Sequence, residues 1–541
     1  MGYDFDAIVI GAGHNGLAAA GYLGRADLRT LVLERRHVVG GAAVTEEFHP
    51  GYRNSIASYV VSLLRSEVIR DLELHKHGYE LIQFEGDLEI CRQDHLFLTG
   101  EEANDRAEIG RFSGRDYDAI QRFEAMLWEI GAVIRNQWLR EPPSLRAGVL
   151  DFPGLLKAGR DIHGLSVEQR HRLLQMFTSS AADIIDRWFE SPMVRSMYAS
   201  HCVSGNNASF YHPGSAIPFF HHALGESDGE HRGWGLARGG MGAVTQAMAS
   251  FARSKGVEIR TDAAVESIVV ERGQARGVRL ESGEEISARA ILSNADPKRT
   301  FLKLVGTQHL PATFTEDISH LRMGHASLRM NLALSGLPEL RDYPGTEIRP
   351  QHQSSIVIYP PMEVMEQNYH TAKAGRLPDE PRLDIVIPST LDNSLAPEGH
   401  HVMSVLCKYY PYELAENQQW NEIRGQVADD IVNYLARYMP NIKSLIVGRQ
   451  VLTPKDLEQV FGLTEGDIFH GRHDLDQIFS LRPHPSAAKY RTPLKGLYLC
   501  GSGAHPGGAV TGAPGHNSAK RVIRDLRSDA LNSRRRSWKS N

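Results

Sequence analysis

The chain opens with an apolar run, a glycine-rich loop and an alanine-rich segment, in that order. Residues 7–10 read Ala-Ile-Val-Ile, an uninterrupted apolar run typical of a strand buried on both faces. The sequence GAGHNG follows at 11–16, and the segment 17–23 then predicts a helix. A second apolar run at 30–33 ends at Glu34. Together these segments predict a βαβ unit at the start of the chain.

The glycines and the acid of this unit each have a physical task in binding a dinucleotide. Gly11 permits the tight turn, Gly13 lets the backbone approach a pyrophosphate, and Gly16 lets the helix pack closely on the strand. The helix N-terminus offers free N–H groups to the phosphates. Glu34 is placed to accept hydrogen bonds from a ribose, which favours an unphosphorylated ribose. The unit by itself suits both NAD and FAD, but the glycine pair that ends at Gly41 suits a longer dinucleotide that continues toward a ring system.

Two later regions repeat the strand and helix signals. Apolar residues at i, i+3, i+4 and i+7 predict a helix over 244–251, and a strand is expected at 257–260. Residues 264–292 predict three antiparallel strands separated by glycine turns. Near the other end of the chain, a strand at 496–500 and a glycine-rich loop precede a helix that begins near 511–514. A cofactor held between the first and last regions explains both glycine loops.

The remaining segments carry no motif of equal strength. They include predicted helices at 116–135 and 426–438 and a predicted strand at 354–359. The sequence contains no second GxGxxG, so we expect no separate NAD(P)H domain.

The composition of the chain argues against several classes of protein. Of the 541 residues, 41% are hydrophobic and 23% are charged, which is an ordinary globular balance, and no apolar run is long enough to cross a membrane. The net charge of −5 argues against nucleic-acid binding. Four widely spaced cysteines argue against a redox disulfide or a zinc knuckle, and the adjacent pair His221 and His222 points in different directions on any regular element, so no metal site is expected.

Five stretches together resemble a known superfamily. They are IGAGHNGLAAAGYL at 10–23, ERRHVVGGAAVTEE at 34–47, ARGGMGAV at 237–244, LSNADP at 292–297 and GLYLCGSGAHPGGAVTGAPGHNSA at 496–519. This arrangement resembles the flavin-dependent carotenoid desaturase, isomerase and ketolase superfamily. Within it, the chain is most similar to the pyridine nucleotide-disulfide oxidoreductase domain-containing protein 2 family.

The resemblance implies an α/β fold with a glutathione-reductase-type, Rossmann-like FAD-binding domain and an α+β substrate domain. The FAD-binding domain is expected from 1–60, 232–300 and 490–541, and the substrate domain from 61–231 and 301–489. The expected FAD contacts are Gly11, Gly13, His14, Asn15, Gly16, Glu34, Arg35, Gly41, Ala42, Val265, Gly501, Ser502, Gly512 and Ala513. Many relatives of glutathione reductase place an acid after the C-terminal strand, where this chain has Gly501-Ser502-Gly503, so Ser502 or backbone must substitute.

The expected chemistry is hydride transfer to FAD, in which the protein supplies orientation and excludes water. His505 and His470 are the candidates for a base or a substrate contact, with a structural role as the alternative for each. The leading hypothesis is an oxidoreductase that acts on a lipophilic, isoprenoid-like or acyl substrate, with oxygen, a quinone or a protein as electron acceptor. A carotenoid ketolase or desaturase and a flavin-bearing regulatory or interaction protein remain alternatives.

The expected location is the cytoplasm, and peripheral contact with a membrane stays open. The resemblance implies mitochondrial animal relatives, whereas Asp4 and Asp6 give the first residues here the wrong charge for a presequence. Sparse cysteines are typical of a reducing compartment.

Overall fold

The computed structural model describes residues 2–143, 152–203, 208–227, 230–231, 234–324 and 327–539. The first part of the molecule is built on a sheet with five parallel strands. Its strands run in the order β11 (Glu258–Arg260), β2 (Thr30–Leu33), β1 (Phe5–Ile10) and β14 (Glu285–Ser293), and β20 (Leu497–Leu499) also pairs with β14. The β-meander β12 (Val265–Glu271), β13 (Gln274–Leu280) and β14 extends the sheet. The strands predicted in these regions are thus confirmed.

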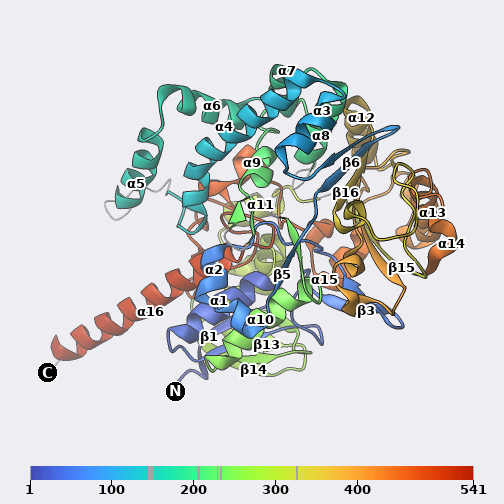
Figure 1. Cartoon of the computed structure of the whole chain (residues 1–541). Coiled ribbons are helices and arrows are strands. Elements are labelled where there is room, and N and C mark those ends of the chain that lie inside the picture. Colours follow the sequence, from blue (N-terminus) through green and yellow to red (C-terminus); the bar gives the residue numbers. More distant parts are fainter. Residues whose placement is uncertain are drawn as a thin grey trace.

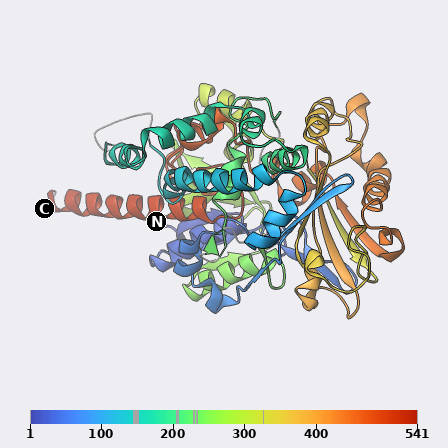
Figure 2. The ribbon, with the colours of Figure 1, turned by 45° about the horizontal axis from the view of Figure 1, so that its top comes forward.

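The central strand β1 is covered on both faces, as its apolar run predicts. Ala7 and Val9 belong to the core shared with helices α1 (His14–Arg25), α10 (Met241–Ser254) and α16 (Ala513–Lys539). Ile8 and Ile10 belong to the opposite core, under the meander. Figure 1 shows α1 and α10 beside β1, β13 and β14, and in both ribbon views α16 extends away from the body (Figures 1 and 2). The first and last segments of the chain therefore meet, and the α/β fold class is confirmed.

A second sheet of seven strands lies beside the first part of the molecule (Figure 2). Its order is β19 (Ile446–Leu452), β15 (Ser327–Leu334), β18 (His401–Lys408), β17 (Leu383–Val386), β16 (Ser355–Tyr359), β6 (Asp87–Cys91) and β7 (Asp94–Leu98). Alternate apolar side chains of these strands pack on helix α13 (Trp420–Leu435). The strand predicted at 354–359 is confirmed. The helix predicted at 426–438 begins earlier and ends at Leu435, where the chain turns before Pro440.

A layer of helices covers the other face of this sheet and reaches the first part. Its longest member, α4 (Gly114–Trp138), contains the helix predicted at 116–135 and carries Phe123 into an aromatic core with Phe189, Tyr198 and Phe219. No helix among the described residues is long and apolar enough to cross a membrane.

The further helices are α2 (Ser66–Asp71), α3 (Glu102–Gly110), α5 (Phe152–His163), α6 (Val167–Thr178), α7 (Ala181–Trp188), α8 (Pro192–Cys202), α9 (Pro218–Ala223), α11 (Ala312–Ser319), α12 (Met362–Lys373), α14 (Ile442–Leu445) and α15 (Pro454–Phe461). Three two-stranded pairs complete the fold: β3 (Thr45–His49) with β4 (Tyr52–Ser55), β5 (Leu81–Gln83) with β10 (Gly235–Ala237), and β8 (Glu226–Ser227) with β9 (Glu230–His231). The division into two domains stays a prediction.

Candidate functional site

The glycine loop between β1 and α1 forms an anion-binding turn. Gly11 has a φ of +94°, a backbone conformation that favours glycine. A Cβ on Gly13 would lie 2.8 Å from Nδ2 of Asn294, and one on Gly16 would lie 2.1 Å from the Gly11 carbonyl. No side chain caps α1 at Gly13, so the first N–H groups of the helix can bind phosphate oxygens.

Glu34 lies at the end of β2, beside this loop, and is held by two backbone groups. Its Oε2 accepts a hydrogen bond of 2.8 Å from the Ala12 N–H, and its Oε1 accepts one of 3.0 Å from the Arg36 N–H. The residue is 6% exposed, so its carboxylate is fixed in place while the remaining lone pairs face the adjoining cavity. This geometry suits the predicted contact with ribose hydroxyl groups.

A cavity of about 1100 Å³, here named the glycine-loop cavity, extends from these residues toward the last segment of the chain. Among the predicted cofactor contacts, ten line it: Gly11, Gly13, His14, Asn15, Glu34, Arg35, Gly41, Ala42, Val265 and Ser502. The first and last segments meet at this cavity, because Nδ2 of Asn15 donates a hydrogen bond of 3.1 Å to Oγ of Ser502. Oδ1 of Asn15 is buried and has no hydrogen-bond partner among the described residues, so it can accept one from a ligand.

The other four predicted contacts do not line the glycine-loop cavity. Gly16 and Gly501 face backbone, because a Cβ on Gly501 would lie 2.5 Å from the Asn294 carbonyl. Gly512 has a φ of +72°, and its Cβ position faces Val68, while Ala513 starts α16 and is fully buried. These glycines are needed for close packing of loop and helix. Their contacts with a cofactor stay predictions.

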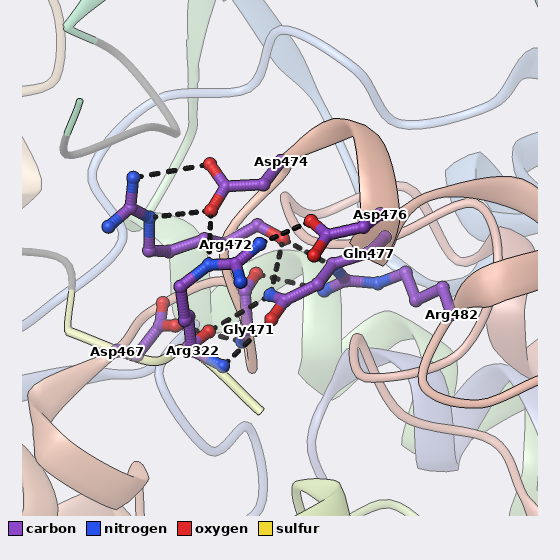
Figure 3. Close-up of polar contacts among 8 residues, drawn as sticks. All are labelled: Arg322, Asp467, Gly471, Arg472, Asp474, Asp476, Gln477 and Arg482. Carbon is purple, nitrogen blue, oxygen red and sulfur yellow. Dashed lines mark hydrogen bonds and ion pairs between the residues drawn. The ribbon is translucent and has the colours of Figure 1, made fainter. Parts of the chain in front are cut away.

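The segment 467–482 is folded around one buried guanidinium, which no sequence pattern indicated. Arg482 is 2% exposed and donates hydrogen bonds to the carbonyls of Gly471, Arg472 and Gln477, each at 3.2 Å, and to two further carbonyls described below. Asp467 accepts from the N–H groups of Phe469 and Gly471 at 2.8 Å, and burial raises its pKa to about 6. Figure 3 shows Arg482 and Asp467 in one cluster with Arg322, whose side chain is half-exposed.

Arg482 also reaches the glycine loop after β20. Its Nη2 donates to the Phe469 carbonyl at 2.7 Å and to the Ser502 carbonyl at 2.8 Å. Burial lowers the pKa of Arg482 to about 10, so the guanidinium stays charged at neutral pH. The segment 467–482 and the loop that carries Ser502 are therefore joined by one side chain.

The two candidate histidines lie in different cavities. His470 lines the glycine-loop cavity, its pKa is lowered by burial, and its Nδ1 has no hydrogen-bond partner among the described residues. His505 is 1% exposed, and its Nε2 donates a hydrogen bond of 3.0 Å to the Gln137 carbonyl. Burial lowers the pKa of His505 to about 4, so its ring is neutral. It lines a separate aromatic cavity of about 660 Å³ with Phe177 and Phe220. A catalytic role for either histidine stays a prediction.

A second large cavity, of about 1130 Å³, adjoins the glycine-loop cavity, since His14, Ala42 and Ile468 line both. We name it the central cavity. His14 donates from Nε2 to the Ala509 carbonyl at 3.1 Å, and burial lowers its pKa to about 4, so a neutral ring stands at the junction.

The wall of the central cavity is mainly apolar, but its far end is charged. The apolar lining includes Ala57, Val60, Leu63, Trp234, Leu406, Leu457, Phe469 and Val510. Arg329, Asp384 and Lys408 line the far end, on strands β15, β17 and β18. None of the three was expected from the sequence, although the alternation of polar and apolar residues in SLRMNLAL at 327–334 was a usable signal.

Comparison with known proteins gives the class. Residues 16–328 match the family described as flavin containing amine oxidoreductase. The chain is 39% identical over 550 residues to pyridine nucleotide-disulfide oxidoreductase domain-containing protein 2 of Rattus norvegicus, an alignment that covers 97% of this chain and 94% of that protein. It is 26% identical to a limonene dehydrogenase subunit from Castellaniella defragrans, over 96% of this chain and 95% of that protein.

Solved structures show the same fold. A triple mutant of putrescine oxidase superposes with a TM-score of 0.62 over 97% of this chain and 99% of that one, at 15% sequence identity. Fold and site thus define an FAD-dependent oxidoreductase. The chain belongs to the flavin containing amine oxidoreductases and, among them, to the family of pyridine nucleotide-disulfide oxidoreductase domain-containing protein 2, in the superfamily that includes the carotenoid desaturases.

The residues of the glycine-loop cavity fit FAD. The loop has no room for a Cβ at Gly13 and leaves helix N–H groups for a diphosphate. Glu34 is oriented for a ribose, and the buried Oδ1 of Asn15 is ready to accept a hydrogen bond. The cavity adjoins the central cavity, which gives space for a ring system and a substrate beside the dinucleotide site.

Proposed function

We propose that this oxidoreductase removes a hydride from a carbon atom of a lipophilic substrate, isoprenoid-like or acyl. The observation that carries the proposal is that the dinucleotide site adjoins a mainly apolar cavity, with His14, Ala42 and Ile468 lining both. An apolar wall favours an apolar ligand through the hydrophobic effect. The name of one relative, a limonene dehydrogenase, supports the same substrate class.

FAD supplies the two-electron acceptor when it is bound. The N-terminus of α1 would hold the diphosphate through its N–H groups, and Glu34 would hold the ribose through its carboxylate. His14 is neutral, so it adds no charge where the two cavities adjoin. The apolar wall of the central cavity would exclude water from the reacting carbon. No side chain is assigned as a base, because hydride transfer to a flavin needs orientation first.

The proposal includes a small lipophilic molecule as the partner, a separate electron acceptor, no nucleic acid and a cytoplasmic location. The four cysteines are buried free thiols, which fits a reducing compartment. Peripheral membrane contact would serve the delivery of a lipophilic substrate.

Anaerobic bleaching of the flavin absorption band tests the proposal. The purified holoprotein is mixed with limonene, phytoene, hexadecanoic acid or putrescine, and lipids retained by the protein are identified by mass spectrometry and tested in the same way. We expect bleaching by one of the lipophilic compounds and none by putrescine. Bleaching by phytoene alone would favour the carotenoid alternative. Bleaching by putrescine and by no lipophilic compound would refute the proposal. Bleaching by no compound, including the retained lipids, would favour the regulatory alternative.

Blocking the central cavity gives the matched control. Ala57 lines this cavity and is 7% exposed, so Ala57→Phe fills space where the substrate is expected. Ala374 is exposed after the end of α12, so Ala374→Phe adds the same side chain to the surface. We expect Ala57→Phe to retain FAD and lose bleaching, whereas Ala374→Phe should behave as the unmodified protein.

A further inference from the structure

One face of the second sheet turns charged side chains toward the central cavity. Successive side chains of a strand point to opposite faces. On β15, β17 and β18 one set, which includes Met330, Ile385 and Val405, packs in the core against α13. The other set places Arg329, Asp384 and Lys408 at the end of the central cavity, each less than 9% exposed. Three neighbouring strands thus deliver ionisable groups to one buried point.

Arg329 has hydrogen-bonding capacity that the protein does not use. Its Nη2 donates to the Ser55 carbonyl at 3.3 Å and to Oγ of Ser404, and its guanidinium lies 4.7 Å from the centre of the Tyr59 ring. Its Nε and Nη1 are buried and have no hydrogen-bond partner among the described residues. Arg329 is 1% exposed, and burial lowers its pKa only to about 10, so it is a cation at neutral pH. Buried donors of this kind normally have an acceptor.

The nearby carboxylate is already committed. Oδ2 of Asp384 accepts a hydrogen bond of 2.6 Å from Nη1 of Arg382, which is itself 2% exposed. Asp384 is the one carboxylate that lines the central cavity among the described residues. Burial lowers the pKa of Lys408 to about 7 and raises that of Tyr59, so Lys408 is partly charged at neutral pH and Tyr59 is neutral. Arg329, Arg382 and Lys408 therefore share one nearby carboxylate, that of Asp384.

We propose that Arg329 and Lys408 bind the carboxylate of an amphiphilic substrate whose apolar chain lies along the central cavity. A single negative charge would offset part of this positive charge and would give the unused donors of Arg329 an acceptor. The apolar residues Leu63, Leu406 and Val510 line the same cavity and suit the chain. This inference rests on the proposed lipophilic substrate and narrows it to an isoprenoid or fatty acid.

Binding to the oxidised holoprotein tests this proposal without turnover. Dodecanoic acid, its methyl ester and dodecan-1-ol are compared by isothermal titration calorimetry at low ionic strength. The three probes share one chain and differ in the charge of the headgroup. We expect the acid to bind at least about ten-fold more tightly than the ester, because a hydrogen bond to a charged group contributes that much. An acid that binds no better than its ester overturns the proposal.

Variants assign the preference to Arg329. We expect Arg329→Met to remove the preference for the acid and to leave ester affinity within about two-fold. Arg329→Lys, which keeps the charge, should retain part of it. Arg341→Met is the matched control, since Arg341 pairs with Asp342 and neither residue lines the central cavity. If Arg329→Met does not fold, Arg329→Lys and Lys408→Met are used for the test instead. An unchanged preference for the acid over the ester in both variants overturns the proposal.

The same variants separate the carboxylate site from two other outcomes. If Arg329→Met shifts the reduction potential of the bound flavin but leaves the preference for the acid intact, the cluster serves the flavin and the proposal is overturned. If acids bind preferentially but no lipophilic compound bleaches the flavin, the carboxylate site stands and the proposed function fails. If hydrocarbons and esters bleach the flavin while acids show no preference, the proposed function stands without this site.

Discussion

Replacement of Arg482 by methionine should loosen two segments of the cofactor site at once. The guanidinium is buried and donates to the carbonyls of five residues, of which those of Phe469 and Ser502 are approached within 2.8 Å. Counting only these two, at about 1.5–2.5 kcal/mol for each buried hydrogen bond from a charged donor, gives a loss of roughly 3–5 kcal/mol. Loss of the three longer hydrogen bonds adds to this loss of stability, and relaxation of the loops reduces it, so the two effects offset each other in part.

Thermal unfolding, followed by the fluorescence of released flavin, measures this loss. For a chain of this length we expect Arg482→Met to lower the melting temperature by roughly 3–4 °C and to release FAD before global unfolding. Arg322→Met is the matched control in the same cluster, because Arg322 pairs with Asp474 on the surface at 45% side-chain exposure (Figure 3). That exposed pair contributes about 0–1 kcal/mol. Equal melting temperatures for Arg482→Met and the unmodified protein, or equal losses in the two variants, would refute the reasoning.

Three further predictions use the same purified protein. Gly13→Asp should abolish FAD loading, since its side chain would meet Asn294 and repel the diphosphate, whereas Gly425→Asp, with nothing within 4 Å, should retain full flavin absorbance. Iodoacetamide should leave all four thiols unmodified under native conditions, because each is buried and burial raises its pKa; rapid alkylation detected by mass spectrometry would contradict this. Affinity for dodecanoic acid should be greatest below pH 7 and should fall as the pH rises, because the pKa of Lys408 before the acid binds is about 7 and a bound carboxylate raises it; Lys408→Met should remove this dependence.

Local patterns were sufficient to predict the strands of the first sheet and the glycine turn between β1 and α1. The apolar run 7–10 predicts a strand covered on both faces, and the structure places Ala7 and Ile8 in opposite cores. The glycine spacing from Gly11 to Gly16 predicts a turn that excludes side chains, and the clashes expected for a Cβ at Gly13 and Gly16 agree. Both signals depend on residues that are close together along the chain, so they can be recognised in a single sequence.

The charged end of the central cavity could not be predicted in the same way. Arg329, Asp384 and Lys408 come from three strands, and only the pairing of β15 with β18 and of β18 with β17 brings them together. The alternation of polar and apolar residues in one strand shows that Arg329 lies on the face opposite the apolar side chains. It does not show which groups of the protein lie against that face. Arg482 is similar, because its acceptors are carbonyls, which leave no signature in the sequence. Gly512 has a structural reason of its own, a positive φ and a Cβ position that faces Val68, while its contact with the cofactor stays a prediction.

The loop after β20 connects the cofactor and substrate parts of the site through its backbone. Ser502 lines the glycine-loop cavity, Ala509 and Val510 line the central cavity, and His505 lines the aromatic cavity. The Ser502 carbonyl is held by Arg482, and the Ala509 carbonyl is held by His14 on α1. Because one loop forms a wall of all three cavities and is fixed at both of these points, a change that shifts it for FAD also reshapes the space for the substrate. Under the proposed function, the contacts that fix this loop beside the cofactor also shape the space for the substrate, whereas the proposed headgroup site on β15, β17 and β18 lies outside the loop.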